Sequence, residues 1–139
     1  MDIAALVLWA LTAAGGFVLL FTWSSGGGLR EPTASHLPRP VLFGHFLLAA
    51  IGLVLWIVYV AADSKAVAWT AFGFLAAVVL LGFAMFARWL PDHRSRNEVA
   101  EPATAAVPAE RSFPVVLVMG HGLLAATTLV LVLIAAVMG

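Results

Sequence analysis

Four long apolar segments occupy most of this 139-residue chain, at residues 3–23, 41–62, 66–90 and 113–138. An α-helix rises about 1.5 Å per residue, so about 20 apolar residues are enough to cross the hydrocarbon core of a bilayer. Each segment reaches this length, and together they leave no room for a soluble domain. We therefore expect an all-α integral membrane protein, a single domain of four transmembrane helices in the lipid bilayer.

Composition supports this class and excludes several kinds of site. Hydrophobic residues make up 63% of the chain and charged residues 10%, whereas about a quarter of a soluble domain is charged. Asp2 stands where an export signal has basic residues, so we interpret the first segment as a retained helix. The chain has no cysteine, which excludes disulfides, thiolate zinc sites, iron–sulfur clusters and covalently attached haem. Any metal must be held by His, Met or oxygen.

The basic residues predict an orientation. Six arginines lie in or beside the two longer loops, residues 24–40 and 91–112, and only Lys65 lies at the opposite end of the helices. Lysine and arginine near helix ends favour the cytoplasm, so both loops should be inside and both termini outside. The preference for arginine, with much Ala and Val, suggests a bacterium, and hence its inner membrane. No block of basic residues indicates nucleic-acid binding.

One sequence pattern occurs twice. Gly44-His45 and Gly120-His121 each open the pattern G-H-x-L-L-A-A-x-x-L-V-L, at an offset of 76 residues. A weaker match at an offset of 66 pairs Gly16 with Gly82 and Trp23 with Trp89. We interpret the chain as a duplicated helical hairpin, residues 1–62 and 66–138, with a pseudo-twofold axis along the membrane normal.

The duplication should bring two histidines together. Pro38 precedes His45 by seven residues, and Pro114 precedes His121 by the same seven, so both rings should lie at one depth. A histidine inside the membrane is costly unless its ring nitrogens have partners. Helical bundles commonly build cofactor sites from facing side chains. We therefore predict that His45 and His121 face each other across the axis and ligate one haem b.

The neighbouring residues suit a flat ring. Small residues precede the two histidines or follow at the i+4 and i+7 positions of the same helix face, and these are Gly44, Ala49, Gly52, Gly120, Ala125 and Thr128. They should leave a slot for the cofactor, although a bond from Thr128 to its own helix backbone is an alternative. Arg39 and Arg111 are placed to pair with haem propionates on the cytoplasmic side.

Other interpretations remain open. Duplication alone would place two histidines equivalently, and each ring can hydrogen-bond a neighbouring carbonyl as a link between helices. A zinc or copper site needs three or four ligands, which would require His36 and His93, interpreted here as solvated loop residues. Met119 should face away from His121. The four spans contain no Asp or Glu in their interiors, which disfavours a proton pump or antiporter.

Paired histidines in a four-helix membrane bundle resemble the b-type cytochrome subunits that anchor membrane dehydrogenases and hydrogenases. The resemblance covers the second and fourth helices. It implies electron transfer, with a quinone or a respiratory complex as partner, by a binding protein more than by a stand-alone enzyme. The outer half has no histidine, which limits the chain to one haem. The alternatives are an accessory or assembly subunit, or a carrier that delivers haem or a metal; a homodimer is compatible with each.

Overall fold

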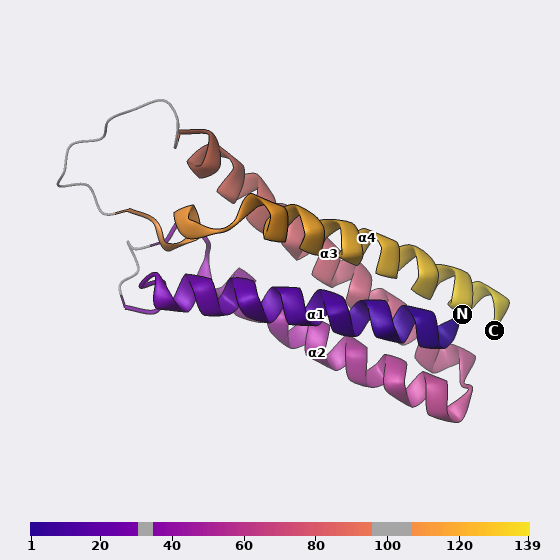
Figure 1. The fold of residues 1–139 in the computed structure, drawn as a ribbon. Helices are drawn as coiled ribbons and strands as arrows, with labels where there is room; N and C mark the ends of the chain where they lie inside the picture. Colours follow the sequence, from indigo (N-terminus) through magenta and orange to yellow (C-terminus); the bar gives the residue numbers. More distant parts are fainter. Residues whose placement is uncertain (31–34, 96–106) are drawn as a thin grey trace.

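The computed structural model describes residues 1–30, 35–95 and 107–139. Four long helices run along one another, with a short 3-10 helix before the last of them (Figure 1). The elements are α1 (Asp2–Ser25), α2 (Arg39–Ala62), α3 (Lys65–Ser95), η2 (Ala109–Ser112) and α4 (Val115–Met138). All four long helices have the length and apolar composition needed to cross a membrane. The predicted four-span, all-helical fold is therefore confirmed, and the chain is a multi-pass membrane protein.

The helices form two layers. α2 packs most extensively against α3, and α1 against α4, while contacts between these two pairs are fewer. α2 and α4 consequently stand diagonally across the bundle. Both termini lie at one end and both long connections at the other (Figure 1), as two successive hairpins require. The assignment of the connection end to the cytoplasm stays a prediction.

Equivalent prolines start α2 and α4. Pro38 precedes α2 with φ −65° and ψ 121°, and Pro114 precedes α4 with φ −65° and ψ 124°. Proline suits this position because the first helical residues have no partner for their N–H groups and its φ is fixed near the helical value. At the other end, Asp63 takes a left-handed conformation (φ 51°) and closes α2, with its N–H donating to the Tyr59 carbonyl.

α3 is longer than the predicted segment. It continues past residue 90 through Pro91 and ends at Ser95. The last turn is held by a bond from Ser95 Oγ to the Asp92 carbonyl, and by the His93 ring, which stacks on Trp89 at 4.9 Å. His93 therefore lies in a helix and is half-buried, so its interpretation as a solvated loop residue is wrong.

Two buried clusters form the core, one toward each end of the bundle. The cluster nearer the termini consists of Ala5, Trp9, Trp56, Tyr59, Ala68, Ala71, Leu75, Val132, Ala135 and Ala136. The cluster at the connection end consists of Trp23, Leu37, Leu42, Trp89, Ala109 and Phe113. The matched tryptophans of the weaker repeat, Trp23 and Trp89, thus belong to one cluster. Large apolar side chains also cover the outside of the helices, where lipid would surround them, and include Phe21, Leu80 and Leu123.

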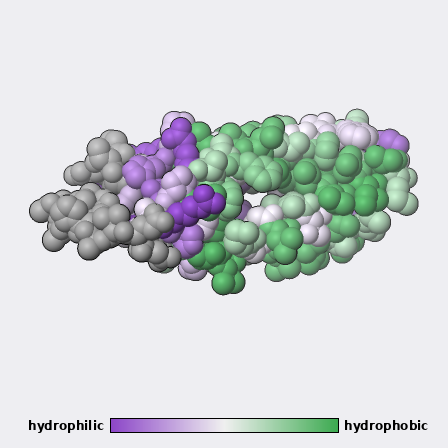
Figure 2. Space-filling view, turned by 90° about the horizontal axis from the view of Figure 1, so that it is seen from above, coloured by the Kyte–Doolittle hydropathy of each residue, from purple (hydrophilic) through white to green (hydrophobic). Residues whose placement is uncertain are grey.

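Between the two clusters the bundle is open. No residue is buried in four stretches at the same height, residues 13–22, 43–51, 79–88 and 115–127. We call this region the open level. Each stretch covers at least nine residues, or about 14 Å of helix at 1.5 Å per residue. Figure 2 shows the apolar surface hollowed between two rows of side chains, near the hydrophilic end. Interiors of folded proteins are normally close-packed, so this level differs from the two buried clusters on either side of it.

Candidate functional site

The structure brings the two repeated histidines together inside the open level. His45 projects from α2 and His121 from α4, the two helices that stand diagonally. Their ring centroids are 6.3 Å apart, with an angle of 56° between the ring planes. Both residues are half-buried. Two imidazoles from opposite helices therefore meet at one level near the axis of the bundle.

Each imidazole is held by a backbone carbonyl of a neighbouring helix. His45 Nδ1 donates to the Val78 carbonyl of α3 at 2.9 Å, and His121 Nδ1 donates to the Thr12 carbonyl of α1 at 3.0 Å. A carbonyl oxygen can only accept a hydrogen bond, so in a neutral ring Nδ1 carries the hydrogen and Nε2 keeps its lone pair. Within residues 1–30, 35–95 and 107–139, neither Nε2 makes a hydrogen bond. A fixed tautomer of this kind is typical of histidines that ligate metals through Nε2.

Two glycines let the imidazole rings reach these carbonyls. Gly16 lies four residues after Thr12, and Gly82 four residues after Val78. Side chains in a helix lean toward its N-terminus, so a side chain at this position would crowd the carbonyl. A Cβ added at Gly16 would lie 3.2 Å from His121 Cε1, and one added at Gly82 would lie 3.4 Å from Cε1 of His45. The two glycines that match at an offset of 66 are therefore the positions against which the imidazole rings pack.

The distance between the rings suits a shared metal ion. A metal–imidazole bond would be about 2 Å long, and the ring centre lies roughly 1 Å behind the nitrogen, so two imidazoles that shared one ion would have centres about 6 Å apart. The observed 6.3 Å agrees with this value. The residues present thus fit bis-histidine ligation of an iron held in a flat macrocycle.

The other small residues selected from the sequence fall into two groups. A Cβ added at Gly44 or Gly120 would meet no atom within 4 Å, and Ala49 and Ala125 are half-buried at the open level. Both glycines therefore have open space around them, and the assignment of all four positions to a cofactor slot stays a prediction.

Packing between helices accounts for the remaining two. Gly52 lies against Trp9, whose Cζ2 would be 2.9 Å from an added Cβ. Thr128 is fully buried, and its hydroxyl donates to the Leu124 carbonyl at 2.7 Å and lies 3.4 Å from that of Thr12. The alternative expected for Thr128, a bond to its own helix, is confirmed.

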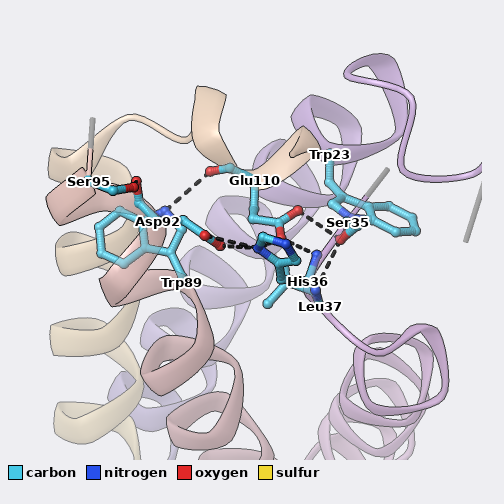
Figure 3. Close-up of polar contacts among 8 residues, drawn as sticks. All are labelled: Trp23, Ser35, His36, Leu37, Trp89, Asp92, Ser95 and Glu110. Carbon is cyan, nitrogen blue, oxygen red and sulfur yellow. Dashed lines mark hydrogen bonds and ion pairs between the residues drawn. The ribbon is translucent and has the colours of Figure 1, made fainter. Parts of the chain in front are cut away.

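A polar network closes the bundle at the connection end (Figure 3). Its centre is Glu110 in η2, which is fully buried. The Glu110 carboxylate accepts hydrogen bonds from the Ser35 hydroxyl, at 2.7 Å, and from the His36 backbone N–H. Trp23 Nε1 donates to Ser35 Oγ at 2.9 Å, and Trp89 Nε1 donates to the Glu110 carbonyl at 3.2 Å. The network joins the segments that lead into α2 and α4, and so fixes the helices that carry the two histidines.

His36 forms an ion pair at the edge of this network. Its Nδ1 lies 2.9 Å from both carboxylate oxygens of Asp92 and 4.0 Å from Glu110 Oε1. The hydrogen bond to Asp92 raises the pKa of His36, and the negative charges of Asp92 and Glu110 add to this, while desolvation opposes it. Potential metal-ligand atoms of the three residues lie within 4.8 Å of one another, but they already bond within the network. His36 is exposed, but its ion pair links the segment before α2 to Asp92 in α3.

Arginines lie beside the start of α2. Arg39 and Arg88 line a cavity of about 620 Å³ at the connection end. Arg88 was not selected from the sequence, because its place near a helix end is explained equally well as an orientation signal. Arg111, which was selected, lies in η2 and is half-buried, and it is not part of the cavity lining. Thr12 and Val78 were missed as well, since a backbone carbonyl leaves no signature in the residue type.

Comparison with family models, with curated proteins and with solved structures finds no match for this chain.

Proposed function

We propose that the protein is a small membrane cytochrome that binds one haem b through His45 and His121. One observation carries this proposal: two imidazoles, each hydrogen-bonded through Nδ1 to a carbonyl, lie with ring centroids 6.3 Å apart at a level of the bundle where no described residue is buried. Duplication alone would explain equivalent positions for the histidines. It gives no reason for the hydrogen bonds that leave both Nε2 atoms available at a level without buried residues.

The protein and the haem would contribute different things. The haem iron supplies one-electron chemistry when bound. The Thr12 and Val78 carbonyls hold the two rings in the tautomer that leaves Nε2 for a metal. The apolar residues above and below the open level exclude water. The network around Glu110 holds the helices together at the connection end, where electron exchange with a quinone or a respiratory complex of a bacterial inner membrane would take place.

The test is a spectrum of the full-length chain purified in detergent. We expect a Soret band that shifts on reduction and gives the split α and β bands of a low-spin haem. His45→Ala and His121→Ala should each remove this spectrum. The matched control is His93→Ala, which alters a histidine outside the open level and should retain it. Circular dichroism checks that all three variants are helical.

Two results would contradict the proposal. One is a wild-type protein that stays colourless after haem is supplied during expression, which would favour an accessory or assembly subunit. The other is an unchanged low-spin spectrum in both His45→Ala and His121→Ala. A haem that washes out readily from the wild type would favour a delivery carrier.

A further inference from the structure

A cavity that the described residues form lies outside the histidine pair. It has a volume of about 620 Å³ and opens at the connection end, between the start of α2 and the end of α3. Its lining comprises Ser35, His36, Leu37, Pro38, Arg39, Pro40 and Arg88. Two arginines on the wall of one cavity indicate that its occupant is an anion.

Arg39 has an incomplete set of partners. Its Nη2 atom is buried, and within the described residues it makes no hydrogen bond. A buried polar group without a partner is costly, and more so when it is charged. The planar guanidinium matches a carboxylate, which it can bind through two parallel hydrogen bonds. The N-terminus of the 24-residue helix α2 lies at the same place, and its dipole adds positive potential.

The cavity is aligned with the histidine site. Arg39 lies six residues before His45 on α2, and Arg88 lies six residues after Gly82, the residue in contact with the His45 ring. At 1.5 Å per residue, both arginines are about 9 Å nearer the connection end than the imidazole. A ligand whose apolar body occupies the open level can therefore place acidic substituents in the cavity.

We propose that Arg39 and Arg88 bind the carboxylate groups of the haem and so set its orientation, with the propionates on the α2 and α3 side of the connection end. This assignment rests on the proposed function. It differs from the expectation for Arg111, because the cavity pairs Arg39 with Arg88.

The test compares two ligands that differ only in these carboxylates. Full-length apoprotein in detergent is titrated with haem b and with its dimethyl ester, and retention is followed by the low-spin spectrum. Wild-type protein should bind the ester at least about tenfold more weakly, as expected for the loss of charge-assisted hydrogen bonds. Arg39→Gln and Arg88→Gln should each reduce this discrimination, and the double variant should bind both ligands equally. Arg94→Gln, an exposed position on the same helix as Arg88, is the matched control and should discriminate like wild type.

The outcomes separate the two proposals. Absence of a low-spin spectrum from wild type with either ligand would remove the proposed function, and this assignment with it. A normal spectrum with equal binding of haem and ester would overturn the assignment alone. If, in that case, wild-type protein bound anionic phospholipid and the Arg39→Gln variant did not, the anion in the cavity would be a lipid phosphate. The comparison within wild type needs no substitution, so a variant that fails to fold does not affect it.

Discussion

The Nδ1 atom of His121 donates a hydrogen bond to the carbonyl of Thr12 at 3.0 Å, across the interface between α4 and α1. The pseudo-equivalent bond joins His45 in α2 to Val78 in α3. The second helix of each repeat therefore places its histidine against the first helix of the other repeat. Neither hairpin alone would hold its imidazole, so the site depends on the packing of both halves.

Gly16→Ala should weaken haem binding. The added Cβ would lie 3.2 Å from Cε1 of His121, so the ring must shift by a few tenths of an ångström, and crowding of this kind costs about 1–3 kcal/mol. We expect affinity for haem to fall about tenfold or more, measured by titration of apoprotein. Gly82→Ala should have a smaller effect, since its Cβ would lie at 3.4 Å from the His45 ring.

The matched control for the glycine variants is Gly73→Ala on α3, where an added Cβ meets no atom within 4 Å. Alanine is the better helix former by about 1 kcal/mol, so this variant should be as stable as wild type or more stable, with unchanged haem affinity. Equal affinities for all three variants would contradict the role assigned to Gly16 and Gly82.

Glu110→Ala should destabilise the fold. The carboxylate is fully buried and accepts hydrogen bonds from the Ser35 hydroxyl and the His36 N–H, and a buried donor left without an acceptor costs about 1–3 kcal/mol. Glu110→Gln keeps one carbonyl oxygen and should lose less. Thermal unfolding followed by circular dichroism should give melting temperatures that decrease in the order wild type, Glu110→Gln, Glu110→Ala. A Glu110→Ala variant as stable as wild type would show that the network does not contribute to stability.

The apolar segments predicted the fold because helices are the main solution for a chain that must satisfy its backbone inside lipid. The repeat then placed His45 and His121 at one level, since equal spacing from Pro38 and Pro114 gives equal depth. These predictions required only the length and periodicity of the sequence. They did not depend on how the side chains pack.

Packing decided the rest, and the sequence could not show it. Gly52 was assigned to the cofactor slot because it is small and correctly spaced, but in the structure it accommodates the Trp9 ring. Gly16 and Gly82 match in the sequence, but their role depends on the imidazole rings that pack against them, which no residue type in α1 or α3 indicates. The predicted third segment ends at residue 90, whereas a hydrogen bond and ring stacking beyond Pro91 extend α3 to Ser95.

Thr128→Val should leave haem binding unchanged. Valine keeps the shape of the buried side chain and removes a hydroxyl that bonds to the Leu124 carbonyl of its own helix. Thr12 keeps its bond to Leu8, and hydrogen bonds between membrane helices contribute only about 0.6 kcal/mol on average. The free energy of unfolding should therefore change by less than about 1 kcal/mol. Loss of the low-spin spectrum in this variant would instead place Thr128 in the cofactor site.

The ion pair of His36 should make stability depend on pH. Its bond to Asp92 raises the pKa of His36 in the folded protein, so the folded state favours the protonated ring. The stabilisation is then fully present below the ordinary pKa of 6.5 and is lost as the pH rises through the raised value. Melting temperature should fall slightly between about pH 6 and 8. Asp92→Asn should remove this dependence, and an unchanged slope in that variant would assign it to another group.

The orientation can be measured because the chain has no cysteine of its own. Ser25→Cys places a thiol at the connection end of α1, and Ser64→Cys places one in the turn between α2 and α3 at the opposite end. The bias of six arginines against Lys65 predicts that the connection end faces the cytoplasm. A membrane-impermeant maleimide added to intact spheroplasts should label only Ser64→Cys, and the same reagent on inside-out vesicles only Ser25→Cys. The reverse pattern would turn the protein over and move the proposed haem to the outer side of the membrane.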